Sequence, residues 1–255
     1  MFKIGDIVSR YKYNNDCLFK IIDIKENSYY LSGINIRLCA NAFKDDLKIE
    51  NNYYREDDSN LINSIKDNID QISNDYFFIP GKILHIDADK DYLNRCLKFY
   101  KELNINAYGI YCEEENLSNQ ISKYLNDIKP DIVIITGHDA FNKFNNKYKN
   151  SDCFIDAIKK SRDYEKSYDK LKIIAGACQS NYEELIKAGA SFASSPKRVN
   201  IHALDPAIIA SFLALTENNK EIDLIKVLNN TKSKSDGMGG LKTFGCMIVG
   251  YPKKK

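Results

Sequence analysis

The sequence predicts a mostly parallel α/β sheet with helices on both faces, preceded by a small β module. From residue 81 onward, short apolar runs alternate with amphipathic runs, the pattern of a parallel sheet covered on both sides. The first 50 residues instead carry short β-like runs separated by polar turns, which is typical of a small barrel of the SH3 kind. A chain of 255 residues can accommodate a medium-sized domain together with such a module.

The N-terminal module is predicted over residues 1–50, and a polar linker with a helix follows over residues 51–80. The helix begins behind a capping Ser59. Its apolar residues recur at helical spacing, at Leu61, Ile62, Ile65, Ile69 and Ile72. Residues 81–255 are predicted to form the α/β domain.

Within the α/β domain, strand-like and helical runs follow each other in a regular order. Strands are predicted at 81–88, 106–112, 130–137 and 171–177. Helices are predicted at 89–103, 115–128, 181–189, 205–217 and 221–230, and a polar and helical stretch runs up to about residue 170. Short extended pieces are predicted at 190–195 and 198–203, before a tail that is glycine-rich and then apolar. In such sheets functional groups gather at the C-terminal ends of the strands.

Composition and charge argue against a general affinity for nucleic acid or membranes. The net charge is only +2, although charged residues make up 28% of the chain, so acidic and basic residues nearly balance. The N-terminal MFKIGDIVSRYKYNND has no basic segment followed by an apolar run, so no signal peptide is expected. No apolar stretch approaches the roughly 18 residues that suggest a membrane span. We therefore expect a soluble, cytoplasmic protein.

The cysteines form neither a zinc pattern nor a disulfide pattern. They stand at Cys17, Cys39, Cys96, Cys112, Cys153, Cys178 and Cys246. Their number is odd, and no two of them form a Cys-x-x-Cys pair. A disulfide framework is not expected in the cytoplasm, and most of these residues are predicted to be small buried hydrophobes. The sequence predicts no metal site and no organic cofactor.

Two predicted strands end in residues suited to catalysis. DIVIITGHDA places His138 just past one buried strand, and LKIIAGACQS places Cys178 just past the next. If the two strands are neighbours in one parallel sheet, the thiol and the imidazole can form a nucleophile and its base. A helix predicted directly after Cys178 would favour the thiolate. Backbone N–H groups in these turns, with Gly137 and Asp139 in one of them, are candidates to bind an oxyanion.

Each of these residues also has a plainer interpretation. Cys178 alone is most simply a buried inert thiol, and His138 alone is a loop residue that caps a strand end. Their matching positions favour catalysis for the pair. His85 lies inside its predicted strand and is interpreted as structural, whereas His202 lies near a strand end and is a candidate to border the site.

Two other motif interpretations fit less well. A glutamine amidotransferase has Gly-x-Cys-x-Gly at its nucleophile, and GACQS lacks the second glycine. The GMGG of the tail does not match Gly-x-x-x-x-Gly-Lys-Ser/Thr, and no helical pattern follows it. A flexible turn is therefore a better interpretation of the tail than a phosphate-binding loop.

The two strand-end blocks resemble the caspase–clostripain–separase group of cysteine peptidases, with the histidine before the cysteine. Together with IIAGACQSNYEELIKAGASFASSPKRVNIHALDPA and the N-terminal GDIVSR, they look like the YabG family of sporulation-specific peptidases over most of residues 1–252. The resemblance implies a caspase-like sheet. It also implies that Cys178 matches the family's nucleophile and His138 its base.

The resemblance further implies a cysteine endopeptidase that acts during spore formation on spore coat and cortex-associated proteins, with a preference for cleaving after arginine. The Gly-His-Asp sequence departs from the His-Gly of the wider group, because Asp139 stands where a glycine is usual. Asp139 is therefore predicted either to orient a group of the active site or to cap a helix.

A preference for arginine requires a carboxylate in the pocket that binds the substrate side chain, because a guanidinium is best matched by a carboxylate. Clostripain-like enzymes place this acid two residues before the cysteine, where this chain has Gly176. The acid is therefore expected elsewhere, with Asp205 and Asp87 favoured and Asp89 a third candidate. Asp89 also precedes a predicted helix, and capping is the slightly favoured interpretation of this residue.

A rival hypothesis is a non-catalytic α/β scaffold whose N-terminal barrel docks on protein or nucleic acid. The two hypotheses differ in the reactivity of Cys178, because a catalytic thiol has a lowered pKa. The segment SSPKRVN is a candidate self-cleavage loop near Arg198, and a solvated turn is its plainer interpretation.

Overall fold

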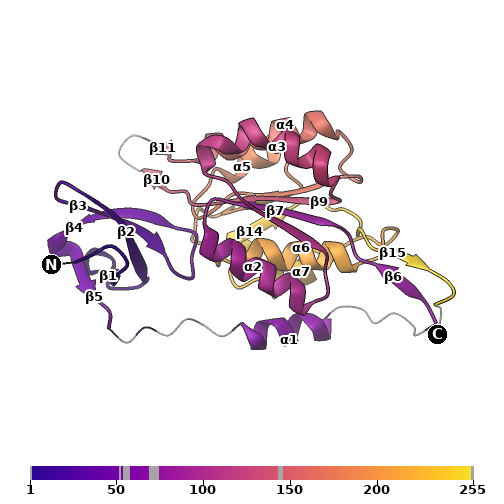
Figure 1. Ribbon diagram of the computed structural model, residues 1–255, viewed down its shortest axis with the longest axis horizontal. Helices are drawn as coiled ribbons and strands as arrows, with labels where there is room; N and C mark the ends of the chain where they lie inside the picture. The colour runs from indigo at the N-terminus through magenta and orange to yellow at the C-terminus, as the bar shows by residue number, and fades with distance from the viewer. Residues whose placement is uncertain (1, 52, 54–57, 69–74, 143–145, 254–255) are drawn as a thin grey trace.

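The computed structural model describes residues 2–51, 53, 58–68, 75–142 and 146–253, and its centre is a six-stranded sheet (Figure 1). In sheet order the strands are β14 (Met238–Gly240), β13 (Phe192–Ser194), β12 (Lys172–Ala175), β9 (Ile132–Thr136), β7 (Ile83–Asp87) and β8 (Ala107–Tyr111). All neighbouring strands are parallel except β14, which pairs with β13 in the antiparallel sense. The predicted fold class, a mostly parallel α/β sheet with a small β module before it, is confirmed.

Helices cover both faces of the central sheet (Figure 1). One face carries α3 (Glu114–Ile128), α4 (Ser151–Tyr164) and α5 (Tyr182–Ala188). The other face carries α1 (Ser59–Asn68), α2 (Lys90–Glu102), α6 (Asp205–Leu215) and α7 (Leu224–Asn230). A single-turn helix, α8 (Lys234–Gly237), leads into β14.

The two cores follow from the alternation of side chains along the strands. In β9, Ile132 and Ile134 belong to the core under α2 and α6, whereas Val133 and Ile135 belong to the core under α3 and α4. Because both faces are covered, every residue of this strand is buried, and the strand is a continuous apolar run in the sequence.

The N-terminal module is a five-stranded antiparallel sheet with the strand order β4-β3-β2-β1-β5 and its own small core. Its elements are β1 (Ile7–Arg10), η1 (Tyr11–Tyr13), β2 (Phe19–Lys25), β3 (Ser28–Gly33), β4 (Cys39–Phe43), η2 (Lys44–Asp46) and β5 (Leu47–Ile49). The connection between β3 and β4 leaves the module, and isolated bridges pair Ile36 with His202 and Leu38 with Asp139. The module therefore lies against the C-terminal edge of the central sheet.

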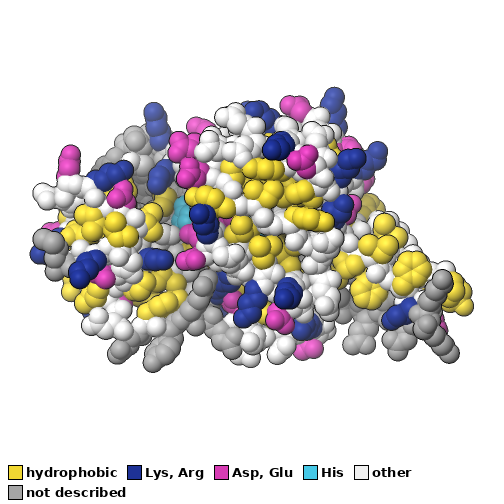
Figure 2. Space-filling model, viewed as in Figure 1, with side chains coloured by type: hydrophobic (Ala, Val, Ile, Leu, Met, Phe, Trp, Pro, Cys, Tyr) yellow, Lys and Arg dark blue, Asp and Glu magenta, His cyan; other side chains and the backbone are white. Residues whose placement is uncertain are grey.

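Two short ribbons complete the fold. The strands β10 (Phe141–Asn142) and β11 (Lys147–Tyr148) form one, just past β9. The strands β6 (Phe77–Ile79) and β15 (Ile248–Gly250) form the other, at the end of the molecule away from the N-terminal module. The second ribbon exposes apolar side chains, and Figure 2 shows them on the surface at that end.

The structure differs from the sequence predictions at several places. The strand β6 lies where a linker with a helix is predicted, and β10 and β11 lie where a polar and helical stretch is predicted. Residues 198–203 are predicted as an extended piece but contain, in the described chain, a single bridge at His202. The tail, for which no strand is predicted, supplies β14 and β15, because each pairs with a strand distant in the sequence. The predicted helical positions Ile69 and Ile72 lie outside the described residues. Within those residues, no helix combines the length and apolar character needed to cross a membrane.

Replacing Ile134 by alanine is expected to lower the free energy of unfolding by about 2–5 kcal/mol, because this side chain is fully buried and its loss leaves a cavity. Urea denaturation followed by circular dichroism measures the change. The matched control is Ile225→Ala in α7, where the side chain is 73% exposed and the expected change is below about 0.5 kcal/mol. Equal losses in the two variants would contradict the assignment of the core.

Candidate active site

Three central strands bring their C-terminal ends to one edge of the sheet. The strands β7, β9 and β12 are parallel neighbours, with Asp87 of β7 opposite Thr136 of β9. Asp87 is the last residue of β7, His138 lies two residues past β9, and Cys178 lies three residues past β12. The strand adjacency on which the catalytic hypothesis depends is therefore present.

A glycine shapes the turn that carries Cys178. Gly176 has a φ of +106°, and a Cβ atom at this position would collide with the Ser194 hydroxyl group. Both features exclude an ordinary side chain. No acid can therefore stand two residues before the cysteine without rearranging this turn.

Cys178 is fully buried and protonated in this conformation. Its Sγ accepts a hydrogen bond from the Ile201 N–H (3.2 Å), and the thiol donates to the Ile201 carbonyl oxygen (3.6 Å). Burial raises the pKa of the thiol above its usual range, although the Ile201 N–H opposes this. The expectation of a lowered pKa is therefore wrong for this conformation. The helix α5 begins only at Tyr182, and the edge of the sheet around the thiol is covered.

His138 lies between the N-terminal module and α2. Its Nε2 is 2.8 Å from the Ser32 hydroxyl oxygen and 3.4 Å from Asp89 Oδ2, and its ring stacks on Tyr92 with the centroids 5.5 Å apart. Burial lowers the pKa of the imidazole, although the Asp89 carboxylate opposes this. The ring is therefore neutral near neutral pH, as a general base needs to be. In the described part of the chain, no hydrogen bond joins His138 to Cys178.

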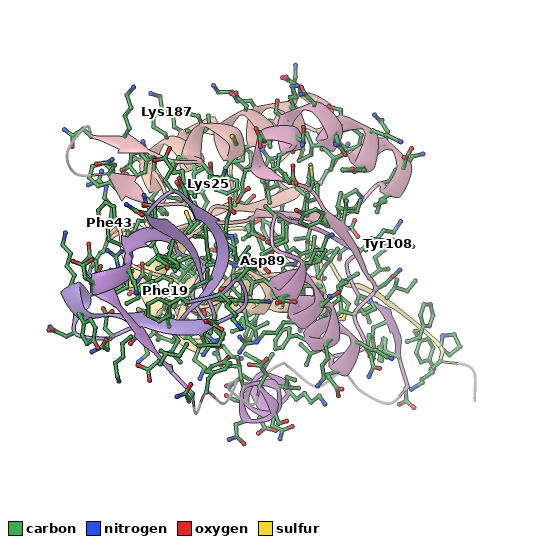
Figure 3. All side chains as sticks on the ribbon, turned by 60° about the vertical axis from the view of Figure 1, so that its left-hand side comes forward. Phe19, Lys25, Phe43, Asp89, Tyr108 and Lys187 are labelled. Carbon is green, nitrogen blue, oxygen red and sulfur yellow. The ribbon has the colours of Figure 1, made fainter. Side chains whose placement is uncertain are left out.

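Asp89 caps α2 and also faces His138. Its Oδ1 accepts hydrogen bonds from the N–H groups of Asp91 and Tyr92, so the capping interpretation is confirmed. Its Oδ2 lies near the imidazole and 3.5 Å from the Ser32 hydroxyl oxygen. Figure 3 labels Asp89 where the N-terminal sheet passes in front of the start of α2. The carboxylate is placed to orient the histidine.

Asp139 is buried, and its carboxylate forms hydrogen bonds with both strand-end loops. Its carboxylate accepts hydrogen bonds from the N–H groups of Ala140, Lys149 and Asn150 and from the hydroxyls of Ser151 and Ser180. The Ser180 hydroxyl in turn accepts a hydrogen bond from the Ala177 N–H (2.9 Å). One carboxylate thus joins the loop of His138 to the turn of Cys178, which agrees with an orienting role more than with helix capping.

Gly137 lets the chain pass close to α3. A Cβ atom at this position would lie 2.6 Å from a Glu114 carboxylate oxygen, which accepts a hydrogen bond from the His138 N–H (2.9 Å). The His138 N–H is therefore already occupied. The Cys178 N–H instead donates to the Arg37 carbonyl oxygen (3.3 Å), so it points to where a substrate carbonyl could lie.

Asp87 forms a buried ion pair with Arg37 of the N-terminal module. Arg37 Nη1 lies 2.7 Å from Asp87 Oδ2, and both side chains are fully buried. The carboxylate also accepts hydrogen bonds from the Thr136 hydroxyl (2.9 Å) and the Asp89 N–H (3.0 Å). Burial alone would raise the pKa of Asp87, but Arg37, His85 and the hydrogen bond from the Asp89 N–H lower it below its usual range. The sequence analysis missed Arg37, whose only signal is a single basic residue in the run INIRLC.

The remaining candidates make other contacts. Asp205 begins α6, and its carboxylate accepts hydrogen bonds from the N–H groups of His202, Lys232 and Ser233. His202 is buried and pairs with Ile36 through an isolated bridge. Arg198 is exposed, and its guanidinium donates to the Tyr148 hydroxyl (2.8 Å).

Among the described residues, no group of three or more His, Cys, Asp or Glu side chains is arranged to hold a metal ion. His85 lies inside β7, between the Tyr100 hydroxyl (2.9 Å) and the Thr136 hydroxyl (3.1 Å), as the structural interpretation predicts. All seven cysteines are free thiols.

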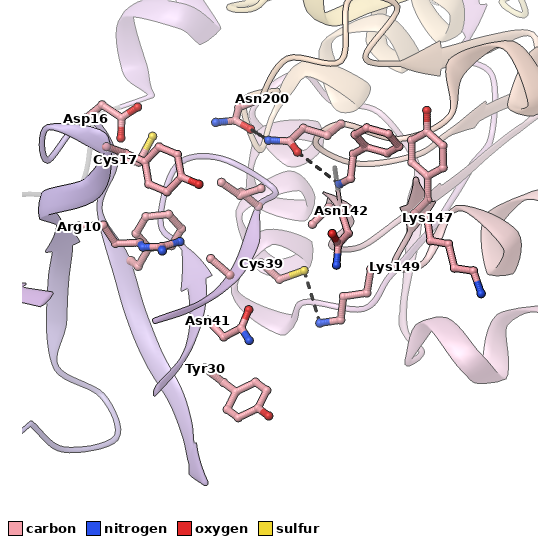
Figure 4. Close-up of a pocket in the computed structure, with 18 residues that line it drawn as sticks. Arg10, Asp16, Cys17, Tyr30, Cys39, Asn41, Asn142, Lys147, Lys149 and Asn200 are labelled. Carbon is pink, nitrogen blue, oxygen red and sulfur yellow. Dashed lines mark hydrogen bonds between the residues drawn. The ribbon is translucent and has the colours of Figure 1, made fainter. Parts of the chain in front are cut away.

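A cavity of about 880 Å³ lies beside the site, between the N-terminal sheet and the β10–β11 ribbon (Figure 4). Residues 38–41 line one side and residues 147–149 the other. Lys149 Nζ lies 3.5 Å from Cys39 Sγ across this space. Gln179, the residue after Cys178, also lines the cavity, so the cavity adjoins the cysteine turn.

The chain is similar to known proteins over almost its whole length. The family model of the YabG peptidases, U57, matches residues 3–252. The sporulation-specific protease YabG of Bacillus subtilis (strain 168) is 38% identical over 286 aligned positions, which cover 99% of each chain. The match includes the N-terminal module as well as both strand-end loops, so the module is part of the family's architecture.

Replacing Asp139 by alanine is expected to lower the free energy of unfolding by at least about 3 kcal/mol, because several buried donors lose their acceptor and each costs about 1–3 kcal/mol. Thermal and urea denaturation measure the loss. Asp152→Ala, an exposed position in α4, is the matched control and should change stability little. If Asp139→Ala were as stable as the control, the carboxylate would not hold the two loops together.

Proposed function

Because the chain belongs to the YabG peptidase family and is therefore a peptidase, we propose that it is a cysteine endopeptidase that cleaves after arginine. Cys178 is the nucleophile and His138 is its base. The observation that carries this proposal is the position of the two residues just past the ends of neighbouring parallel strands, at one edge of the sheet.

In the proposed reaction, His138 takes the thiol proton of Cys178, and the sulfur attacks the substrate carbonyl carbon. The Cys178 N–H stabilises the oxyanion of the tetrahedral intermediate. Collapse of the intermediate breaks the peptide bond, and the amine leaves with the proton from His138. Water then hydrolyses the thioester, which releases the new carboxyl terminus and restores the thiol.

The surroundings of His138 support its role as the base. Asp89 and Ser32 lie next to Nε2, which leaves Nδ1 for the proton transfer. The Asp89 carboxylate also stabilises the imidazolium that forms during the reaction. The pair is not hydrogen-bonded in this conformation, and catalytic pairs often close only when substrate binds.

For the substrate arginine we propose Asp87 as the acid of the binding pocket. Its support is direct chemistry, since Asp87 already binds a guanidinium at 2.7 Å in a fully buried position. Asp205, which the sequence favours equally, is instead bonded to three backbone N–H groups. Asp89 is occupied by the helix cap and the histidine.

The named relative supports a biological role. The Bacillus subtilis relative is named as a sporulation-specific protease. We propose that this chain likewise acts during sporulation and processes spore coat and cortex-associated proteins. The non-catalytic scaffold is the alternative, and loss of proteolysis on a single thiol substitution separates the two.

Cys178→Ala is expected to reduce cleavage of an arginine-containing protein substrate by roughly 10⁴- to 10⁶-fold, because the nucleophile is lost. Electrophoresis and mass spectrometry of the products measure the cleavage and its position. Cys153→Ala, at a partly buried thiol in α4, is the matched control and should cleave like the wild type. Full activity of Cys178→Ala would rule out this mechanism.

Asp87→Asn is expected to lower the preference for arginine over an uncharged residue by about 10- to 100-fold, because a hydrogen bond to a charged group contributes about 1.5–3 kcal/mol. The measurement is the ratio of kcat/KM for two matched peptides, which does not depend on the fraction of folded enzyme. Asp205→Asn is the control and should leave that ratio unchanged. If Asp205→Asn lowered this ratio and Asp87→Asn did not, Asp205 would be the acid of the arginine pocket.

A further inference from the structure

The connection between β3 and β4, residues 34–38, lies in the candidate active site. We propose that this segment occupies the substrate cleft of its own chain, with Arg37 in the position of the substrate arginine, and thereby keeps the cleft closed. This inference rests on the proposed function and adds its regulation. Three observations support the inference: the main-chain hydrogen bonds of residues 34–38, the contacts of the Arg37 side chain, and the position of the segment against Cys178.

The main chain of the segment pairs as an extended peptide would. The Arg37 N–H donates to the Ile201 carbonyl oxygen (3.2 Å), and the Ala203 N–H donates to the Asn35 carbonyl oxygen (3.0 Å). Between these bonds, Ile36 pairs with His202 in the antiparallel sense. Addition of a strand to an exposed backbone is a general mode of peptide recognition. Residues 201–203 therefore offer an edge for a bound peptide, and this segment fills it.

The carbonyl group of Arg37 lies at the nucleophile. The Cys178 N–H donates to this carbonyl oxygen (3.3 Å), which is the contact expected of a carbonyl under attack. The next residue, Leu38, forms a parallel bridge with Asp139 in the histidine loop. The peptide bond after Arg37 thus lies between the two strand-end loops, in the register of a bond that follows a substrate arginine.

The side chain of Arg37 fills the arginine pocket. Its Nη1 binds Asp87 at 2.7 Å, its Nε and Nη2 donate to the Ala203 carbonyl oxygen at 3.2 and 2.9 Å, and its guanidinium lies over the Tyr92 ring. Burial would lower the pKa of the guanidinium, but Asp87 raises it, so the charge is kept. A buried arginine with this many specific partners leaves no room in the pocket for a second one.

Residues on both sides of Arg37 are held as well. The Tyr92 hydroxyl donates to the Ile36 carbonyl oxygen (2.7 Å), and the Arg95 guanidinium donates to Asn35 Oδ1 (3.1 Å). On the other side, Leu38 enters the wall of the cavity shown in Figure 4. The segment thus lies against Cys178, which is completely buried in this conformation, as an active nucleophile could not be while it meets a substrate.

The experiment measures how fast Cys178 of the full-length protein is alkylated by an arginyl chloromethyl ketone, with peptide mapping by mass spectrometry. An alanyl chloromethyl ketone is the matched reagent without the guanidinium. In Arg37→Ala the pocket is empty, and we expect the arginyl reagent to label Cys178 at least about 10-fold faster than in the wild type. The alanyl reagent should gain less.

A second variant keeps the buried ion pair. A Cβ atom at Gly33 would collide with the Ile36 carbonyl group, so Gly33→Ala displaces the segment while Arg37 and Asp87 remain. The same acceleration is expected, and this variant decides if Arg37→Ala does not fold. Arg198→Ala removes an exposed arginine as the control and should leave the labelling rate unchanged.

Either folded variant overturns the inference if its labelling is no faster than that of the wild type, because Arg37 would then be only a structural residue. Rapid arginine-dependent labelling of the wild type overturns it as well, since an occupied pocket cannot admit the reagent. Failure of the proposed function has a different signature: no variant is labelled at Cys178, and Cys178→Ala still cleaves protein.

Discussion

The buried ion pair between Arg37 and Asp87 is the interaction on which the arrangement of the site depends. Neither charge tolerates burial alone, and removing one partner of such a pair typically costs about 3–5 kcal/mol. Asp87 ends a central strand, so the guanidinium is held at the C-terminal edge of the sheet. The neighbours of Arg37 are thereby placed against residues 201–203 and against the loop past β9. The ion pair thus contributes a buried contact to the docking of the N-terminal module on the α/β domain.

The same docking forms part of the surroundings of the proposed base. The module supplies Ser32 to His138 Nε2, and Tyr92 lies between the two parts of the site, with the Arg37 guanidinium over its ring and the imidazole stacked on it. Departure of the segment would remove the Arg37 guanidinium from the Tyr92 ring on which the imidazole stacks. The position of residues 34–38 and the position of the His138 ring are therefore linked through their shared contact with Tyr92.

The sequence predicts most of the α/β domain, because strands buried on both faces are continuous apolar runs and amphipathic helices repeat at their own period. It also brings out His138 and Cys178, since both follow such strands. The partner of Asp87 could not be predicted, because Arg37 lies 50 residues away in another module and nothing local marks a basic residue for burial. The prediction of a lowered Cys178 pKa was wrong for the same reason, because it assumed that the C-terminal edge of the sheet is open to solvent.

Because residues 34–38 make the contacts that a substrate would make, the segment competes with the substrate for the cleft. A segment anchored on both sides by β3 and β4 acts at an effective concentration on the order of millimolar or above, because its binding is intramolecular. A free substrate with the same contacts would bind only the small fraction of open molecules, and its apparent affinity would fall by that fraction. A successful substrate therefore needs contacts that the segment lacks. The cavity of about 880 Å³ beside the cysteine turn provides space for them, because it opens where the chain continues past the arginine.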